Sequence, residues 1–209
     1  MMTPLSIDNT LNGILCFVFL FISLRAFYLY RHMGTPRLFC LGLSTGMIAL
    51  TAAADLASGV VAGIQFSTNW FLYIGQFVSF VFILLGVLYQ RDDHLRRLMR
   101  CQIVISVLLL TLLFLAPFVP DVPAPLGKVL LSTLRSVICF VIFYRYVFVF
   151  MTKQTQFSFF MATTFMLLSL GYLILSPVFV LPQEYLLDNI GDVMRILGAI
   201  TFFTSFAVV

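Results

Sequence analysis

Charged residues are scarce in this sequence of 209 residues. Asp, Glu, Lys and Arg make up 10% of it, against about a quarter in an ordinary soluble domain, and 62% of the residues are hydrophobic. The mean hydropathy is +1.10. This composition excludes a water-soluble globular domain and indicates an integral membrane protein whose main partner is the lipid bilayer. The net charge of +4 then reflects membrane topology, and we expect no binding of nucleic acid.

Residues that hold metals and cofactors are also scarce. The two histidines, His32 and His94, lie in polar connections, which excludes a haem held by two histidines inside the membrane. The last apolar segment contains no lysine that could carry retinal as a Schiff base. His-Glu-x-x-His motifs and Walker loops are absent as well. We therefore expect no cofactor, no metal site and no enzymatic activity.

The four cysteines lie in or beside apolar segments and have no metal-binding spacing. They are Cys16, Cys40, Cys101 and Cys139. Small apolar thiols in such positions are typical of packing residues, and a disulfide or a reactive role is the alternative.

Seven apolar stretches are long enough to cross a membrane, which takes about 20 residues. They cover residues 11–30, 38–63, 70–90, 99–119, 126–151, 157–180 and 187–209. Breaks rich in Gly, Pro, Asn or charge separate them, such as Gly34-Thr35-Pro36 and Arg91-Asp92-Asp93-His94. The spans use most of the length, so we expect one all-α, seven-helix domain over residues 1–209.

The basic residues predict the orientation of these spans. Arginines and Lys153 concentrate in the first, third and fifth connections, whereas the N-terminus and the second and fourth connections contain none. The positive-inside rule then places the N-terminus outside and the C-terminus in the cytoplasm. Trp70, Tyr73 and Tyr185 would form an aromatic belt at the outer surface.

An internal repeat is suggested by two short matches. Tyr73-Ile74-Gly75-Gln76 in the third span matches Asn189-Ile190-Gly191-Asp192 in the seventh, and Arg25 in the first matches Arg145 in the fifth. The offsets of about 120 residues predict two parallel three-helix repeats joined by the fourth helix. Chance similarity between apolar helices is the alternative.

Polar and charged side chains gather in the outer half of the predicted spans. With a rise of ~1.5 Å per residue, Asp55, Gln76, Arg135, Asp192 and Arg195 all fall there. Helical spacing also places Lys128, Ser132, Arg135 and Cys139 on one face, and Ser169, Tyr172 and Ser176 on another. Such faces should point toward protein, because lipid cannot satisfy polar groups. Pro177 should interrupt its helix and free a backbone carbonyl.

The outer group predicts a ligand site for a small polar or zwitterionic molecule. In this hypothesis Arg135 anchors an acidic group, Asp55 and Asp192 are its counter-charges, and Tyr73 and Gln76 form hydrogen-bonding walls. Arg195 lies three residues after Asp192, where the two can pair along one helix. The alternatives are structural ion pairs that only fix helix packing, and a proton or ion pathway.

Small residues predict close helix packing. The pairs Gly42/Gly46 and Gly59/Gly63 have the four-residue spacing that lets helices approach, and Gly191, Gly198 and Ser205 have heptad spacing. Packing within the monomer is the favoured use, and a homodimer is the alternative. The basic segment from Arg91 to Arg100 could bind anionic lipid head groups or a partner, or serve orientation alone.

The segment Asp192-Val193-Met194-Arg195-Ile196-Leu197-Gly198 resembles the start of the last helix in bacterial seven-helix membrane sensor modules. The resemblance covers about seven residues. It implies reception of a signal by the outer half of the bundle, in a bacterial plasma membrane. Because the sequence contains no kinase, cyclase or regulator domain, the output would then require a cytoplasmic signalling partner or a further part of the protein.

We therefore predict a receptor-like or sensory membrane module. One alternative is a small solute transporter that rocks two three-helix halves about the same site. Another is a structural membrane subunit in which the balanced charges serve packing only.

Overall fold

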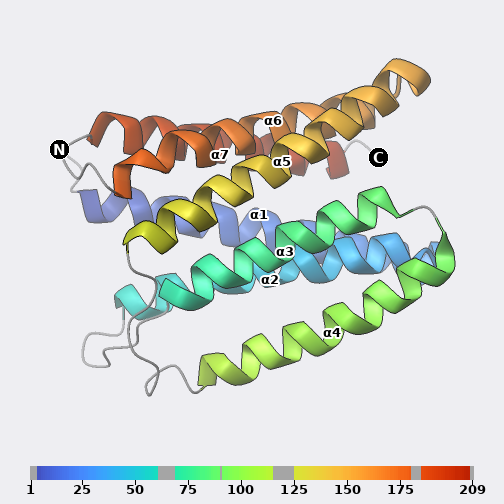
Figure 1. Ribbon diagram of the computed structural model, residues 1–209, viewed down its shortest axis with the longest axis horizontal. Coiled ribbons are helices and arrows are strands. Elements are labelled where there is room, and N and C mark those ends of the chain that lie inside the picture. Colours follow the sequence, from blue (N-terminus) through green and yellow to red (C-terminus); the bar gives the residue numbers. More distant parts are fainter. Residues whose placement is uncertain (1–3, 61–68, 90, 115–124, 180–184, 208–209) are drawn as a thin grey trace. The chain divides into compact units, whose positions relative to one another are not determined.

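The computed structural model describes residues 4–60, 69–89, 91–114, 125–179 and 185–207. These residues form seven long α-helices and a short 3-10 helix, and they contain no strand (Figure 1). The helices are α1 (Pro4–Met33), α2 (Pro36–Val60), α3 (Asn69–Leu88), α4 (Asp92–Phe114), α5 (Pro125–Lys153), α6 (Gln156–Leu175), η2 (Pro177–Phe179) and α7 (Tyr185–Ala207). All seven α-helices are long and apolar enough to cross a membrane, which confirms the predicted fold class.

The predicted break between α1 and α2 is confirmed in detail. Gly34 has a φ of +67° and donates its backbone N–H to the carbonyl of Tyr30, which ends α1. Glycine suits this left-handed conformation because it has no Cβ to clash. Pro36 then occupies the first position of α2, where its missing N–H costs nothing.

The predicted start of the fourth span is wrong. Helix α4 begins at Asp92 and not near residue 99, so its first two turns contain Asp93, His94 and two arginines. Leu95 and Leu98 in these turns are buried against Cys40 and Phe82, and acidic residues suit a helix N-terminus. Leu95 and Leu98 are three residues apart, on one face of the helix, and their burial explains why the helix begins before the apolar run does.

Helix α6 ends earlier than residue 180, at Leu175, and the 3-10 helix η2 follows from Pro177. Pro177 has no N–H for the Leu173 carbonyl, and the N–H of Ser176 donates to Leu173, at 3.3 Å, in place of Tyr172. Ser176 donates its hydroxyl to the carbonyl of Leu173 at 2.8 Å, and Ser132 on α5 donates to that of Tyr172 at 3.0 Å. The predicted freed carbonyl is thus taken up by a neighbouring helix.

The helices divide into two compact units, residues 1–123 with α1–α4 and residues 124–209 with α5–α7. In the first unit α2 packs against α1, α3 and α4, and α4 also packs against α3. Helix α4, predicted as a linker, is therefore held to this unit by its own contacts. Gln102 on α4 donates to the Cys40 carbonyl at 3.0 Å and to Ser44 Oγ at 2.8 Å.

Small residues bring α1 and α2 together, as predicted. A Cβ on Gly46 would lie 2.8 Å from Ser23 Oγ, and Ser23 donates its hydroxyl to the Gly42 carbonyl at 2.8 Å. The pair Gly59/Gly63 lies outside the residues whose side chains are described.

Trp70 contradicts the prediction of an aromatic belt. Its side chain is only 6% exposed and packs with Met47, Phe71 and Leu109. The ring therefore belongs to the core of the first unit, since an indole is large enough to fill a space shared by α2, α3 and α4. Tyr185 has no described side chain.

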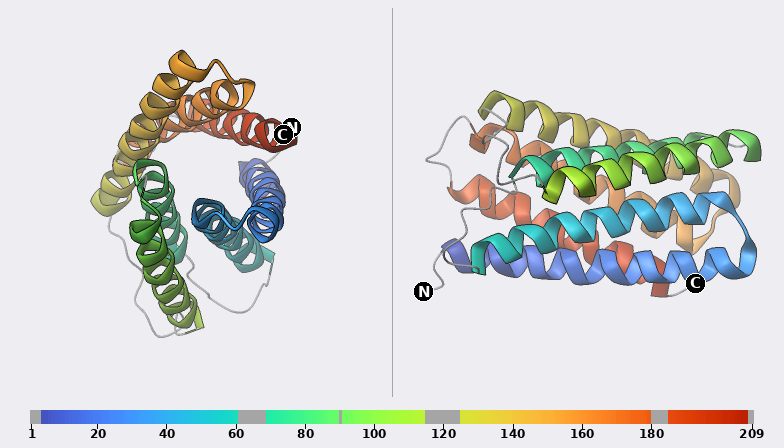
Figure 2. Two further views of the ribbon diagram at one scale, coloured as in Figure 1. Left: turned by 90° about the vertical axis from the view of Figure 1, so that its right-hand side faces the viewer. Right: turned by 90° about the horizontal axis from the view of Figure 1, so that it is seen from below.

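In the second unit α6 packs against both α5 and α7, which run beside it (Figure 2). The heptad of small residues on α7 faces α6. A Cβ on Gly191 would lie 3.2 Å from the Gly171 carbonyl, and one on Gly198 would lie 3.0 Å from the Leu168 side chain. Ser205 is fully buried. The predicted use of these residues in packing within one chain is confirmed.

The cysteines are free thiols, as expected from their surroundings. Cys40 and Cys139 are buried among apolar residues, whereas Cys101 is exposed. Their positions agree with a packing role for the two buried thiols.

Candidate ligand site

Arg135 is a buried cation in the second unit. It lies on α5 and is only 2% exposed. Its Nε donates to the carbonyl of Leu131 at 3.3 Å, and its guanidinium carbon lies 4.6 Å from the centre of the Tyr172 ring. A guanidinium at this distance from an aromatic face is attracted by the ring quadrupole. The predicted protein-facing stripe on α5 is confirmed at Ser132, Arg135 and Cys139, which are buried, whereas Lys128 is partly buried.

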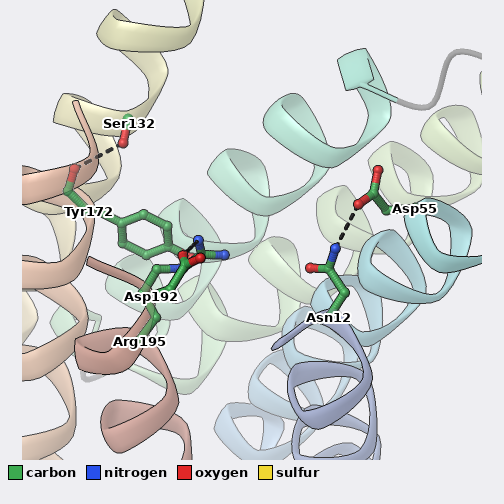
Figure 3. A network of polar contacts seen from close by, with 6 residues as sticks. All are labelled: Asn12, Asp55, Ser132, Tyr172, Asp192 and Arg195. Carbon is green, nitrogen blue, oxygen red and sulfur yellow. Dashed lines mark hydrogen bonds and ion pairs between the residues drawn. The ribbon is translucent and has the colours of Figure 1, made fainter. Parts of the chain in front are cut away.

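Arg195 approaches the same ring from α7. Its guanidinium carbon lies 5.3 Å from the Tyr172 ring centre. Its Nη1 donates to Asp192 Oδ1 at 2.9 Å, so the predicted pairing along the helix is confirmed. Figure 3 shows both side chains beside the tyrosine ring. Both members of this ion pair are largely buried, which strengthens the attraction between them.

Tyr172 joins the two arginines, although the sequence analysis did not name it as a site residue. It lies on α6 and is 3% exposed. Its position in the polar stripe with Ser169 and Ser176 was the available signal. Reciprocal hydrogen bonds hold α5 against α6 one turn away: Ser136 donates to the Ser169 carbonyl at 2.8 Å and Ser169 to the Ser136 carbonyl at 3.0 Å.

Gly171 explains how Arg195 comes so close to α6. A Cβ at this position would lie 2.8 Å from Arg195 Cγ and 3.0 Å from the Gly191 carbonyl. The absence of a side chain lets the arginine stem lie across α6, beside the tyrosine. Close packing of two helices thus determines where the charge is held.

We call Arg135, Tyr172, Asp192 and Arg195 the arginine–tyrosine cluster. It combines two guanidinium groups, one carboxylate and one aromatic face from three helices. Guanidinium groups donate paired hydrogen bonds to carboxylate or phosphate, and a carboxylate accepts from an ammonium group. The cluster therefore has the chemistry to hold a small molecule with an acidic group, with or without an amine.

Asp55 lies on α2, in the first unit. Asn12 on α1 donates from Nδ2 to Asp55 Oδ2 at 2.7 Å, and this bond links α1 to α2 (Figure 3). The sequence analysis missed Asn12, because a single amide near the start of an apolar helix carries no spacing signal. Asp55 is partly buried and Asn12 is buried.

Gln76 and Tyr73 lie on α3 in the same unit. Gln76 is 2% exposed, which fits the predicted protein-facing position, whereas Tyr73 is only partly buried. Gly75 faces α2, where a Cβ would lie 2.7 Å from Thr51 Cγ2. The structure thus brings together Arg135, Asp192 and Arg195 in one unit. A site that also includes Asp55, Tyr73 and Gln76 stays a prediction.

Helix α2 also contains Gly42-Leu43-Ser44-Thr45-Gly46, which matches the Gly-x-Ser-x-Gly pattern of serine hydrolases. In those enzymes the serine lies on a sharp turn between a strand and a helix. Here Ser44 is fully buried in the middle of α2 and its Oγ accepts a hydrogen bond from Gln102. The pattern in this chain therefore serves helix packing.

The side chains that the structure describes contain no cluster of three or more His, Cys, Asp or Glu residues that could hold a metal ion. No protein-family model, curated protein or solved structure matches the chain. Its function is therefore argued from the geometry of the arginine–tyrosine cluster, and the resemblance to bacterial sensor modules stays a hypothesis.

Proposed function

We propose that the protein is a receptor-like sensory membrane module, and that its ligand site is the arginine–tyrosine cluster. The observation that carries this proposal is the placement of two guanidinium groups, from α5 and α7, on the single buried ring of Tyr172. In the predicted topology this site lies in the outer half of a bacterial plasma membrane. A cytoplasmic partner would receive the signal.

The cost of burying charge supports a functional role. Ionisable groups inside membrane spans are expensive, and they commonly mark ligand or ion sites. Arg195 lies 2.9 Å from Asp192 along α7, so the two groups form an ion pair that is largely buried. Arg135, on α5, lies over the same tyrosine ring at 4.6 Å from its centre, so two guanidinium groups share one aromatic face. An acidic ligand group between two such cations would receive several charge-assisted hydrogen bonds.

The test uses protein in lipid nanodiscs and a panel of small carboxylates and amino acids. We expect at least one compound to raise the midpoint of thermal unfolding of the wild type. Arg135→Gln should abolish that rise, because glutamine cannot supply the charge or the paired donors. Arg145→Gln is the matched control, since Arg145 is a partly buried arginine of the same helix outside the cluster.

Equal responses of the two variants would show that the cluster is not the site. If both variants fold and no compound stabilises the wild type, the buried charges serve packing alone and the structural-subunit alternative is favoured.

A small transporter is the second candidate, and matching positions in the two units support it. The middle helices α2 and α6 each pack against both flanking helices of their own unit. In the paired segments of α3 and α7, Gly75 and Gly191 face the middle helix, and the next residues, Gln76 and Asp192, are buried. Two equivalent three-helix halves are the usual basis of alternating access.

Arg25 and Arg145, the other matched pair, share an unusual environment. Both are partly buried, and in each the Nε atom is buried without a hydrogen-bond partner. Uptake measurements in proteoliposomes separate the two functions. A sensor binds a compound found in the thermal assay without accumulating it, whereas a transporter moves it across the bilayer.

A further inference from the structure

Five exposed arginines gather at one end of the first unit. They come from the start of α2, the connection before α4 and the first turns of α4: Arg37, Arg91, Arg96, Arg97 and Arg100. Arg37 Nη2 donates to the carbonyl of Tyr89 at 3.2 Å, so the two helix connections lie side by side. We call these five residues the basic tip. The acidic residues in the same stretch of sequence are Asp92 and Asp93.

The basic tip is held in a defined orientation. Leu95 and Leu98 are buried against α2 and α3, which anchors the first turns of α4. The ring of His94 stacks on that of Tyr89, with centroids 5.7 Å apart. The arginines of α4 are therefore directed away from the core on a firmly packed helix.

A stripe of exposed apolar residues continues from the arginines along the same face of α4. Arg97, Arg100, Val104, Leu108 and Thr111 recur at spacings of three and four residues, which places them on one side of a helix. Val104 is 65% exposed and Leu108 is 56% exposed, while Gln102 on the opposite side is buried. From Arg100 to Thr111 the helix rises about 16 Å.

We infer that this face of α4 binds an anionic phospholipid of the surrounding bilayer. One leaflet contributes about 15 Å of hydrocarbon, which matches the length of the apolar stripe. Cationic groups directly above an apolar strip of that length are complementary to a negative head group above an acyl chain. Clusters of arginines beside a membrane span attract anionic lipids in this way. The inference concerns the first unit and does not depend on the arginine–tyrosine cluster.

The binding of an anionic phospholipid to α4 can be tested by native mass spectrometry. The detergent-solubilised protein is titrated with phosphatidylglycerol or with phosphatidylcholine. The wild type should bind phosphatidylglycerol more tightly than phosphatidylcholine. Since each arginine near a head group contributes about fivefold, the double variant Arg97→Gln/Arg100→Gln should bind phosphatidylglycerol roughly 30-fold more weakly. Restoring the charge in Arg97→Lys/Arg100→Lys should recover most of this affinity.

The matched control is Lys128→Gln/Lys153→Gln, which removes the same charge from the two ends of α5, in the second unit. It should bind phosphatidylglycerol nearly as well as the wild type. An equal loss in both double variants overturns the inference, as does equal binding of the two lipids by the wild type. Glycerol phosphate, which has no acyl chain, should not compete at the same concentration, and effective competition would exclude a role for the apolar stripe.

Discussion

Tyr172 is the residue on which the buried charges of the second unit converge. Both guanidinium groups lie over its ring, at 4.6 and 5.3 Å from the centroid. Cation–π contacts contribute about 0.5 to 2 kcal/mol each, with the larger values at desolvated sites. Tyr172→Leu should therefore lower the free energy of unfolding by about 1–3 kcal/mol. Tyr172→Phe keeps the aromatic face and should cost less, as reversible unfolding in mixed micelles would measure. Equal destabilisation by the two variants would show that the ring face is unimportant.

Gly171 offers a second test at the scale of single residues. Alanine at this position would place a Cβ 2.8 Å from Arg195 Cγ and 3.0 Å from a backbone carbonyl of α7. The backbone cannot yield easily, so α6 and α7 should move apart at a cost of about 1–3 kcal/mol. The thermal unfolding midpoint should fall. In the control Gly86→Ala, the new Cβ would meet only Cys40 Cβ, at 3.9 Å, and the midpoint should be unchanged or higher.

A destabilised Gly86→Ala with an unaffected Gly171→Ala would reverse the expected order. Such a result would mean that close approach of α6 and α7 does not position Arg195.

At the scale of elements, the end of α6 depends on help from α5. Pro177 has no N–H for the Leu173 carbonyl, so the N–H of Ser176 donates to that carbonyl, at 3.3 Å, and not to its usual acceptor, the Tyr172 carbonyl. Ser132 donates to the Tyr172 carbonyl at 3.0 Å, and the Ser176 hydroxyl does so at 3.3 Å. Ser132→Ala should cost about 1 kcal/mol, within the range measured for hydrogen bonds between membrane helices. In a Pro177→Ala background α6 can extend and satisfy this carbonyl itself. The cost of Ser132→Ala should then fall by about 0.5 kcal/mol or more in a double-mutant cycle. Strictly additive effects would contradict this account of the α6 end.

The boundaries of α4 show where a reading of hydropathy fails. The apolar run begins near residue 99, but the helix begins at Asp92. The first two turns are mostly polar, and in them Leu95 and Leu98 are buried in the core of the first unit. Hydropathy detects the part of a helix that lies in lipid, whereas the helix continues as long as its buried face finds neighbours.

At the scale of the whole molecule, topology is the most direct prediction. The positions of the basic residues predict that the N-terminus is outside and the C-terminus in the cytoplasm. Alkaline phosphatase fused after residue 121 should be active, and green fluorescent protein fused after residue 154 should fluoresce in the cytoplasm. The reverse result at both positions would show that the bundle has the opposite orientation in the membrane. The arginine–tyrosine cluster would then lie in the inner half of the membrane, and the proposal of an outward-facing receptor would fail.

Residue patterns along single helices predicted part of the candidate site. The pairing of Asp192 with Arg195 follows from their spacing on one helix, and the burial of Arg135 follows from the polar stripe on α5. Asn12 could not be found in this way, because its partner Asp55 is 43 residues away and on another helix. The contact of Arg135 and Arg195 with the ring of Tyr172 could not be predicted either, because it depends on the packing of three helices.

Composition and periodicity alone determined the class of this protein. Scarce charge and seven apolar runs require membrane helices, because only a hydrogen-bonded backbone can cross lipid. The same patterns predicted the faces of α5 and α6 that meet protein. Only the tertiary structure decided which polar groups meet, that Trp70 belongs to a core and that α4 packs with α2 and α3. The physical reason is that burial depends on the shape of neighbouring helices, as at Gly171, where a missing side chain lets Arg195 reach the tyrosine.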